Sequence, residues 1–159
     1  MVTDPRDDTD DAHDWWIPDD EWRTIVANVP LVSVDLVIEH DGGVLLGQRS
    51  NEPAKGEWFV PGGTVHKNES RTDAVHRVAT EELGEAVVID KWLMTCEHVY
   101  ETAAVDGVDS KHYLATGYRC HFEAADPEIV GDDQHSAFRV FRPPLEKLHP
   151  YVTQYLDER

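Results

Sequence analysis

GTVHKNESRTDAVHRVATEELG, the stretch from Gly63 to Gly84, decides the fold of this chain. From Ser70 to Leu83 it contains no proline and no glycine, and its apolar residues recur with the period of a helix. Glycine ends a helix well because it adopts the left-handed conformation without strain. The pattern therefore predicts a helix from Ser70 to Leu83 that Gly84 terminates.

The charged residues of this helix have the spacing of a metal site. Arg77 and Glu81 are four residues apart, so their side chains share a face and can pair. Glu81 and Glu82 point about 100° apart around the helix axis, so one can face a cation while the other faces Arg77 or water. The preceding Val60-Pro61-Gly62-Gly63 is expected to be a strand end entering a turn, where glycine lets backbone approach a ligand closely. The simpler alternative is a surface helix with a solvated acidic face.

The spacing G-x5-E-x7-R-x3-EE-x-G resembles the signature of the Nudix hydrolases. The resemblance implies an α/β fold, the Nudix-type α/β/α sandwich with a mixed central sheet, and a divalent metal ion that helps cleave nucleoside diphosphate derivatives. Two positions depart from the signature: Val78 stands where its first glutamate belongs, and Glu85 stands at its last aliphatic position. Losing one carboxylate favours a single hard cation with few protein ligands over several ions.

Three segments point to a narrower resemblance. PLVSVD at 30–35, LLGQRSNEPAKGEWFVPGG at 45–63 and DDQH at 132–135 are similar to the GDP-mannose mannosyl hydrolases, a Nudix subgroup that also lacks the glutamate after the arginine. The resemblance spans roughly residues 18–142. It implies that water attacks the anomeric carbon of a nucleotide sugar and displaces GDP with inversion, whereas the family at large attacks phosphorus.

The same resemblance implies the metal ligands. Mg²⁺, with Mn²⁺ as a possible substitute, would bind Glu82, the carbonyl of Gly62 and the side-chain oxygen of Gln134, and the diphosphate would complete its shell. Glu81 is a further candidate ligand, because the two adjacent glutamates cannot be told apart by spacing alone. Oxygen ligands with few carboxylates suit a magnesium ion shared with phosphates.

The catalytic and substrate-binding residues are also implied by position. His135 would be the general base, since an imidazole titrates near neutral pH. Arg49 would neutralise the departing diphosphate through paired hydrogen bonds. Asp35 would lie near the sugar and stabilise oxocarbenium character or hold the base in place. His98 and Tyr113 match positions that line the pocket, although Tyr113 also alternates as an ordinary core residue would.

One mismatch concerns the leaving group. The subgroup has an arginine directly after the double glycine, and here Thr64 supplies a neutral hydroxyl instead. His66 or Lys67 could reach the phosphates in its place. Two other functions therefore stay open: a Nudix pyrophosphohydrolase that cleaves P–O in ADP-ribose or a nucleoside triphosphate, and a catalytically silent nucleotide-sensing module.

Composition limits the partners. The 159 residues carry a net charge of −18, with 32 Asp and Glu against 14 Lys and Arg. Such a field repels polynucleotides, and it resembles the acidic surfaces of halophilic proteins that concentrated salt screens. No apolar stretch approaches the ~20 residues that cross a bilayer, so no membrane partner is expected. Two cysteines, Cys96 and Cys120, are expected to be reduced thiols of a cytoplasmic protein.

The remaining pattern organises the chain. Residues 1–14 are polar and acidic and are predicted to be a disordered tail, with 15–159 as a single domain. A homodimer is possible, with Trp15, Trp16 and Trp22 packing against a second chain. We expect helices at 20–28 and 70–83, strands at 31–39, 44–49, 58–60, 87–100, 111–123 and 137–141, and a C-terminal helix at 145–156 that Pro150 breaks. The loop 124–134 is expected to overhang the metal and bring His135 to it.

Overall fold

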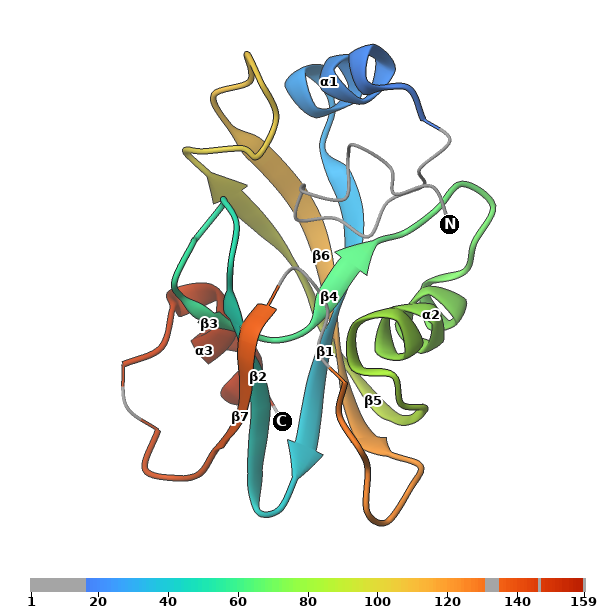
Figure 1. Cartoon of the computed structure of the whole chain (residues 1–159), viewed down its shortest axis with the longest axis vertical. Coiled ribbons are helices and arrows are strands. Elements are labelled where there is room, and N and C mark those ends of the chain that lie inside the picture. Colours follow the sequence, from blue (N-terminus) through green and yellow to red (C-terminus); the bar gives the residue numbers. More distant parts are fainter. Residues whose placement is uncertain (1–16, 131–134, 146, 159) are drawn as a thin grey trace.

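The computed structural model describes residues 17–130, 135–145 and 147–158, with the backbone alone at 135 and 136. Three helices and seven strands follow one another along this part of the chain (Figure 1). In order they are α1 (Asp19–Asn28), β1 (Leu31–His40), β2 (Gly43–Arg49), β3 (Trp58–Phe59), β4 (Gly62–Thr64), α2 (Arg71–Leu83), β5 (Val87–Tyr100), β6 (Lys111–Phe122), β7 (His135–Phe141) and α3 (Pro150–Leu156). The predicted tail, residues 1–14, lies outside the described residues.

The strands form one mixed sheet whose middle opens around β1. Its order is β3-β2-β1-β6-β5, with β4 added to β1 and β7 added to β2. The β1–β6 pair is parallel and the other pairs are antiparallel. β1 pairs with β2 at the hairpin turn, through Glu39 with Val44 and His40 with Gly43, and then pairs with β4 over Ser33–Asp35. β1 and β2 therefore diverge, and β4 enters beside β1.

Helices cover both faces of the sheet, which confirms the predicted α/β sandwich. Successive side chains of a strand point to opposite faces, so β1 contributes to both layers. Val34, Leu36 and Ile38 pack in the layer of α2, and Val37 packs in the layer of α3. A third cluster joins Trp22 of α1 to the end of β6. Trp22 is buried within its own chain, so the expectation that it contacts a second chain is wrong, while Trp15 and Trp16 lie outside the described residues.

The predicted central helix is confirmed with its caps. The Ser70 hydroxyl accepts a hydrogen bond from the backbone N–H of Asp73, which satisfies a donor of the first turn of α2. Gly84 closes the helix in the left-handed conformation with φ 70°. The apolar residues expected on one face are fully buried: Ala74, Val75, Val78, Ala79 and Leu83.

Two local predictions are wrong. The C-terminal helix does not begin near residue 145 and break at Pro150; it begins at Pro150. Proline has no N–H and suits the first turn, where that donor has no helical partner, and His149 before it caps the helix by accepting from the backbone of Tyr151. The double glycine is not a turn either, because Gly62–Thr64 is a short strand.

Two further expectations concern membrane-spanning segments and the cysteines. Among the described helices, none is long and apolar enough to cross a membrane. Both cysteines, Cys96 in β5 and Cys120 in β6, are free thiols, as expected. Burial raises the pKa of the Cys120 thiol to about 12, with the charge of Asp90 adding to it.

Candidate active site

A pocket opens where β1 diverges from β2. Its cavity volume is about 50 Å³, and it opens to solvent. Its walls come from β1 to β6 and from the segment between β2 and β3. The lining residues are Ser33, Asp35, Arg49, Pro53, Phe59, Val60, Gly62, Gly63, His98, Tyr100 and Tyr113. The structure thus brings together five of the predicted site residues, Asp35, Arg49, Gly62, His98 and Tyr113.

The floor of the pocket requires a glycine opposite Asp35. Gly62 and Asp35 are register partners in the β4–β1 pair. A Cβ placed on Gly62 would lie 2.3 Å from Asp35 Oδ1 and 2.8 Å from the carbonyl oxygen of Val34, so no side chain fits there. The double glycine therefore serves a close approach of backbone to the Asp35 carboxylate, and not a turn.

Glu82 reaches the same glycine strand from α2. The backbone N–H of Gly62 donates to Glu82 Oε2 at 3.2 Å, and Glu82 is 1% exposed. A carboxylate and a backbone carbonyl both provide hard oxygen donors of the kind that divalent cations take. Glu82 and the carbonyl of Gly62 therefore fit the predicted metal ion chemically. Within the described residues, no group of three or more His, Cys, Asp and Glu side chains is placed to hold a metal.

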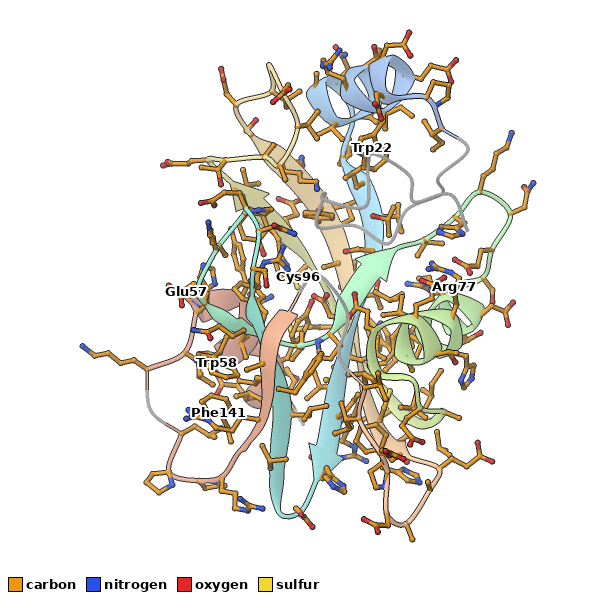
Figure 2. The ribbon with its side chains drawn as sticks, viewed as in Figure 1. Trp22, Glu57, Trp58, Arg77, Cys96 and Phe141 are labelled. Carbon is orange, nitrogen blue, oxygen red and sulfur yellow. The ribbon has the colours of Figure 1, made fainter. Side chains whose placement is uncertain are left out.

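Arg77 joins the middle of α2 to the segment before the helix. Figure 2 shows Arg77 on α2. Arg77 Nε and Nη2 donate to the two oxygens of Glu69 at 2.7 and 3.0 Å, and Nη2 also donates to the carbonyl of Thr64 at 2.8 Å. Arg77 Nη1 donates to Glu81 Oε2 at 2.9 Å, the predicted helical pair. Of the two adjacent glutamates, Glu82 is thus buried at the glycine strand, and Glu81 is half exposed beside Arg77.

The three departures from the family signatures have structural positions. Val78 is fully buried in the layer between α2 and the sheet, where a carboxylate would be costly without a partner. Glu85 accepts a hydrogen bond from the backbone of Glu128 at 2.7 Å and ties the loop after β6 to the end of α2. Thr64 is buried at the end of β4, and Lys67 nearby is exposed.

Asp35 is a carboxylate in an unfavourable environment. Burial raises its pKa from 3.8 to about 6, although a hydrogen bond from Tyr155 and the charge of Arg49 partly oppose the shift. Arg49 lines the same pocket, donates from Nε to the carbonyl of Pro53 at 2.7 Å and lies over the ring of Phe59. Perturbed groups of this kind are common at functional sites.

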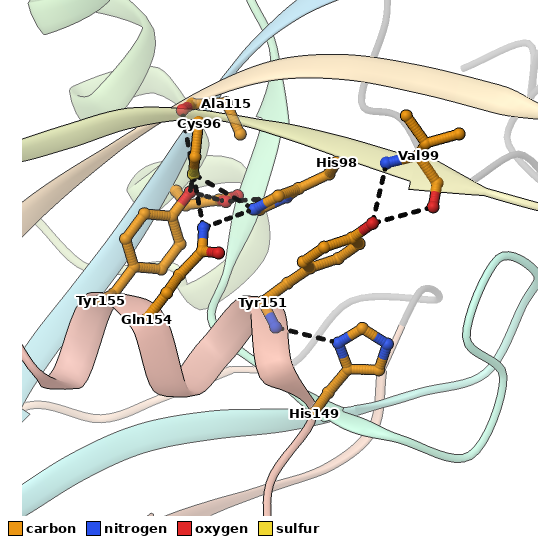
Figure 3. A network of polar contacts seen from close by, with 9 residues as sticks. Cys96, His98, Val99, Ala115, His149, Tyr151, Gln154 and Tyr155 are labelled. Carbon is orange, nitrogen blue, oxygen red and sulfur yellow. Dashed lines mark hydrogen bonds and ion pairs between the residues drawn. The ribbon is translucent and has the colours of Figure 1, made fainter.

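A polar network behind Asp35 was not anticipated from the sequence. The Tyr155 hydroxyl donates to Asp35 Oδ2 at 2.7 Å, and the Cys96 thiol donates to that hydroxyl at 3.4 Å (Figure 3). The Gln154 amide nitrogen donates to Cys96 Sγ and to His98 Nε2, the latter at 3.1 Å. His98 Nδ1 lies 3.9 Å from Asp35 Oδ2. Two residues of α3, Gln154 and Tyr155, therefore support the wall of the pocket from behind.

His98 is neutral in this setting. It is 4% exposed, and burial, with a smaller contribution from His149, lowers its pKa to about 4. An amide nitrogen can only donate, so His98 Nε2 accepts the hydrogen bond from Gln154. Nε2 therefore carries the lone pair of the neutral ring and Nδ1 carries the proton. The ring also stacks on Tyr151 with 4.1 Å between centroids. His98 thus directs an N–H toward Asp35.

Two predicted residues fall at the edge of the described chain. Gln134 and the side chain of His135 lie outside the described residues. The backbone of His135 begins β7 and is the register partner of Arg49 in β2. Before it, the backbone N–H of Val130 donates to the carbonyl of Leu83, so the loop after β6 passes the C-terminal end of α2.

Comparison with known proteins decides the family. The NUDIX domain model matches residues 29–156. The chain belongs to the Nudix family. Nudix hydrolases act on nucleoside diphosphate derivatives and generally use divalent metal ions, so the predicted family and enzyme class are confirmed. The solved MutT Nudix hydrolase from Burkholderia pseudomallei is similar, with 30% identity, a TM-score of 0.63, and 82% of this Nudix chain and 98% of that one covered.

Two characterised relatives differ in what their names describe. The low-salt glycan biosynthesis protein Agl8 of Haloferax volcanii is 64% identical over 141 residues, 89% of either chain. The ADP-ribose pyrophosphatase of Methanocaldococcus jannaschii is 46% identical over 55 residues, which is 35% of this Nudix hydrolase and 32% of that enzyme. The Haloferax relative fits the halophilic character expected from the charge.

Proposed function

We propose that this Nudix hydrolase cleaves a GDP-mannose-like nucleotide sugar to a nucleoside diphosphate and free sugar, by attack of water at the anomeric carbon. The observation that carries the proposal is the partly buried Asp35 carboxylate in the pocket that the neutral His98 and Arg49 also line. A carboxylate repels a diphosphate, so the Asp35 end of the pocket suits the uncharged sugar. It also favours the positive charge that develops on an anomeric carbon during C–O cleavage.

The diphosphate would lie beside the sugar, toward the glycine strand and Arg49. Arg49 offers a guanidinium that can pair with two phosphate oxygens. Glu82 and the carbonyl of Gly62 would hold Mg²⁺ or Mn²⁺ there, with Gln134 and Glu81 as further candidate ligands. A bound ion would neutralise charge on the departing diphosphate. With Thr64 in place of an arginine, Arg49 is the cationic side chain that lines the described pocket.

Three other side chains have proposed roles at the sugar. His135 would accept the proton of the attacking water, and its place beside Arg49 on neighbouring strands supports this assignment. His98 can donate from Nδ1, and Tyr113 contributes an aromatic wall. A carboxylate, an imidazole N–H and an aromatic ring together suit the hydroxyls and the apolar face of a hexose.

A second candidate is hydrolysis of a P–O bond in ADP-ribose or a related compound. The segment shared with the Methanocaldococcus ADP-ribose pyrophosphatase supports it, as does the presence of both Glu81 and Glu82. In that reaction Asp35 would contact the ribose and not the reacting centre. Cytoplasmic location and a homodimer complete the proposal for either substrate.

Hydrolysis in ¹⁸O-labelled water tests the choice between the two. GDP-mannose, other nucleotide sugars and ADP-ribose are incubated with the enzyme, Mg²⁺ and concentrated KCl, and products are weighed by mass spectrometry. We expect turnover of a nucleotide sugar with the label in the free sugar. Label in a phosphate, or turnover of ADP-ribose alone, would contradict C–O cleavage and support the second candidate.

A further inference from the structure

We propose that Tyr155 of the C-terminal helix is a positioning residue of this enzyme, which holds the Asp35 carboxylate in its working orientation. The inference rests on the proposed function, because it assigns Asp35 to the reacting sugar. Tyr155 lies 120 residues from Asp35 in the chain, and neither the family signature nor the pocket lining includes it.

The contacts of the Tyr155 hydroxyl show which group receives its proton. Tyr155 is fully buried and its single hydroxyl proton goes to Asp35 Oδ2 at 2.7 Å. Its oxygen is then left to accept, and the Cys96 thiol donates to it at 3.4 Å. The thiol also lies 3.6 Å from the carbonyl of Ala115, whereas the one proton of the Tyr155 hydroxyl is committed to the Asp35 carboxylate.

The ring of Tyr155 has a place built for it in the sheet. A Cβ on Gly117 of β6 would lie 2.4 Å from Cε1 of the ring, so only a glycine at this position lets the tyrosine reach the carboxylate. Gly117 is also the register partner of Asp35 on the adjacent strand. The fold thus removes a side chain next to Asp35 and fills the space with the Tyr155 ring.

The two oxygens of Asp35 consequently have different surroundings. Oδ2 is held by Tyr155 and faces His98 Nδ1 at 3.9 Å. Oδ1 faces Gly62, whose missing side chain leaves room for it. A carboxylate rotates freely when exposed, and a hydrogen bond to one oxygen fixes the plane of the group. Tyr155 therefore sets which oxygen of Asp35 faces the glycine strand, where the metal ion is proposed to bind.

A matched pair of variants on α3 separates positioning from structure. Tyr155→Phe and Tyr151→Phe each remove one buried or half-buried hydroxyl from the same helix, but the Tyr151 hydroxyl contacts the backbone of Val99 and not Asp35. We expect Tyr155→Phe to lower kcat by about 10- to 100-fold with KM within about threefold, as a misplaced catalytic group does. Tyr151→Phe should keep both constants within about threefold.

A double-mutant cycle gives the decisive readout. The substrate is whichever compound the wild type hydrolyses best, and thermal melting in concentrated KCl sets an assay temperature at which every variant is folded. If Tyr155 acts through Asp35, then Tyr155→Phe will cause no further loss of kcat in the Asp35→Asn background. A general loosening of the fold would instead lower kcat in both backgrounds.

The outcomes separate this inference from the proposed function. Additive losses, equal losses in the two tyrosine variants, or an unchanged kcat in Tyr155→Phe would overturn the positioning role. The ¹⁸O label in the wild-type product decides the reaction independently. If the label appears in phosphate and the cycle is non-additive, Tyr155 positions Asp35 but for a different reaction. If the label appears in the sugar and the cycle is additive, the proposed reaction stands and only the positioning role of Tyr155 is overturned.

Discussion

The two faces of the sheet approach the pocket with different kinds of interaction. On the α2 face, charged groups close in sequence pair with one another: Arg77 contacts Glu69 and Glu81, eight and four residues away. On the α3 face, Tyr155 contacts Asp35 across 120 residues, and Gln154 contacts Cys96 across 58, through neutral donors and a single partly buried carboxylate. The α2 face is a local, ionic arrangement, and the α3 face is a tertiary, mostly neutral one.

This difference matches the division of labour that we propose. The charged face, with Glu82 at its inner end, is suited to a metal ion and a diphosphate, which are small, hard and highly charged. The neutral face, with Asp35 and His98, is suited to a sugar, whose recognition needs oriented hydrogen bonds.

Removing the charge of Glu82 should have the largest effect. Glu82→Gln keeps the size of the side chain but removes the carboxylate proposed for the metal, and we expect kcat/KM to fall by about 10³-fold or more, since a bound ion supplies several kcal/mol of charge stabilisation. Glu81→Gln, the adjacent half-exposed residue on Arg77, should lose far less. Equal losses, measured over a range of Mg²⁺ concentrations, would contradict the assignment of Glu82 over Glu81.

Breaking the Arg77 cluster should mainly affect stability. Arg77→Met leaves Glu69 without its ion pair in a partly buried site, and we expect about 2–4 kcal/mol of destabilisation in denaturant unfolding. Glu81→Met removes only the more exposed partner and should destabilise by about 0.5 kcal/mol. If both variants unfolded alike, the cluster would not be the clamp between the loop and α2.

Asp35→Asn should trade activity for stability. Burial raises the pKa of Asp35 from 3.8 to about 6, so the folded state binds the proton more tightly than the unfolded state does. The wild type therefore carries a penalty that is full above pH 6 and absent below pH 3.8. Asparagine carries none and can still accept from Tyr155, so the variant should be more stable at pH 8 by about 1–3 kcal/mol. It should also be less active.

The pH dependence of that gain is its own control. The stability difference between Asp35→Asn and wild type should shrink as the pH falls from 6 toward 4, because both proteins then have an uncharged side chain at residue 35. Chemical denaturation at pH 8, 6 and 4.5 measures it. A difference that grew on acidification would show that the carboxylate is stabilised, and not penalised, by its surroundings.

Salt concentration should affect variants of the two faces differently, and this difference is the smallest of the expected effects. Activity and melting temperature of the wild type should rise between about 0.1 M and 2 M KCl, because screening reduces the repulsion within a chain of net charge −18. The penalty of Arg77→Met should shrink over the same range, whereas that of Tyr155→Phe should stay constant. A falling melting temperature of the wild type would argue against salt adaptation.

The α2 face could be predicted from sequence because its information is local. A helix of known period, a cap at Ser70, a terminating Gly84 and a four-residue spacing from Arg77 to Glu81 all lie within one segment. The family resemblance added Asp35, Arg49, His98 and Gly62, which the structure places around one pocket. Only the resemblance could supply these, since they come from four different strands.

The α3 face could not be predicted because nothing local marks it. The sequence pattern gives Tyr155 and Gln154 no feature beyond that of a short C-terminal helix. It also predicts the wrong start for that helix, because a proline inside a helical pattern is expected to break the helix, whereas Pro150 begins it. The same limit applies to the double glycine. Glycine is expected both in a turn and where the backbone approaches a side chain closely, so the sequence does not distinguish the two. The β4–β1 register shows that Gly62 approaches Asp35.

A crystal structure of Asp35→Asn with Mg²⁺ and an intact nucleotide sugar tests the central claim most directly. We predict an ion bound by Glu82, the carbonyl of Gly62 and the diphosphate, with the anomeric carbon of the sugar next to residue 35. An ion absent from Glu82, or a nucleobase in place of the sugar between residue 35 and His98, would contradict the account.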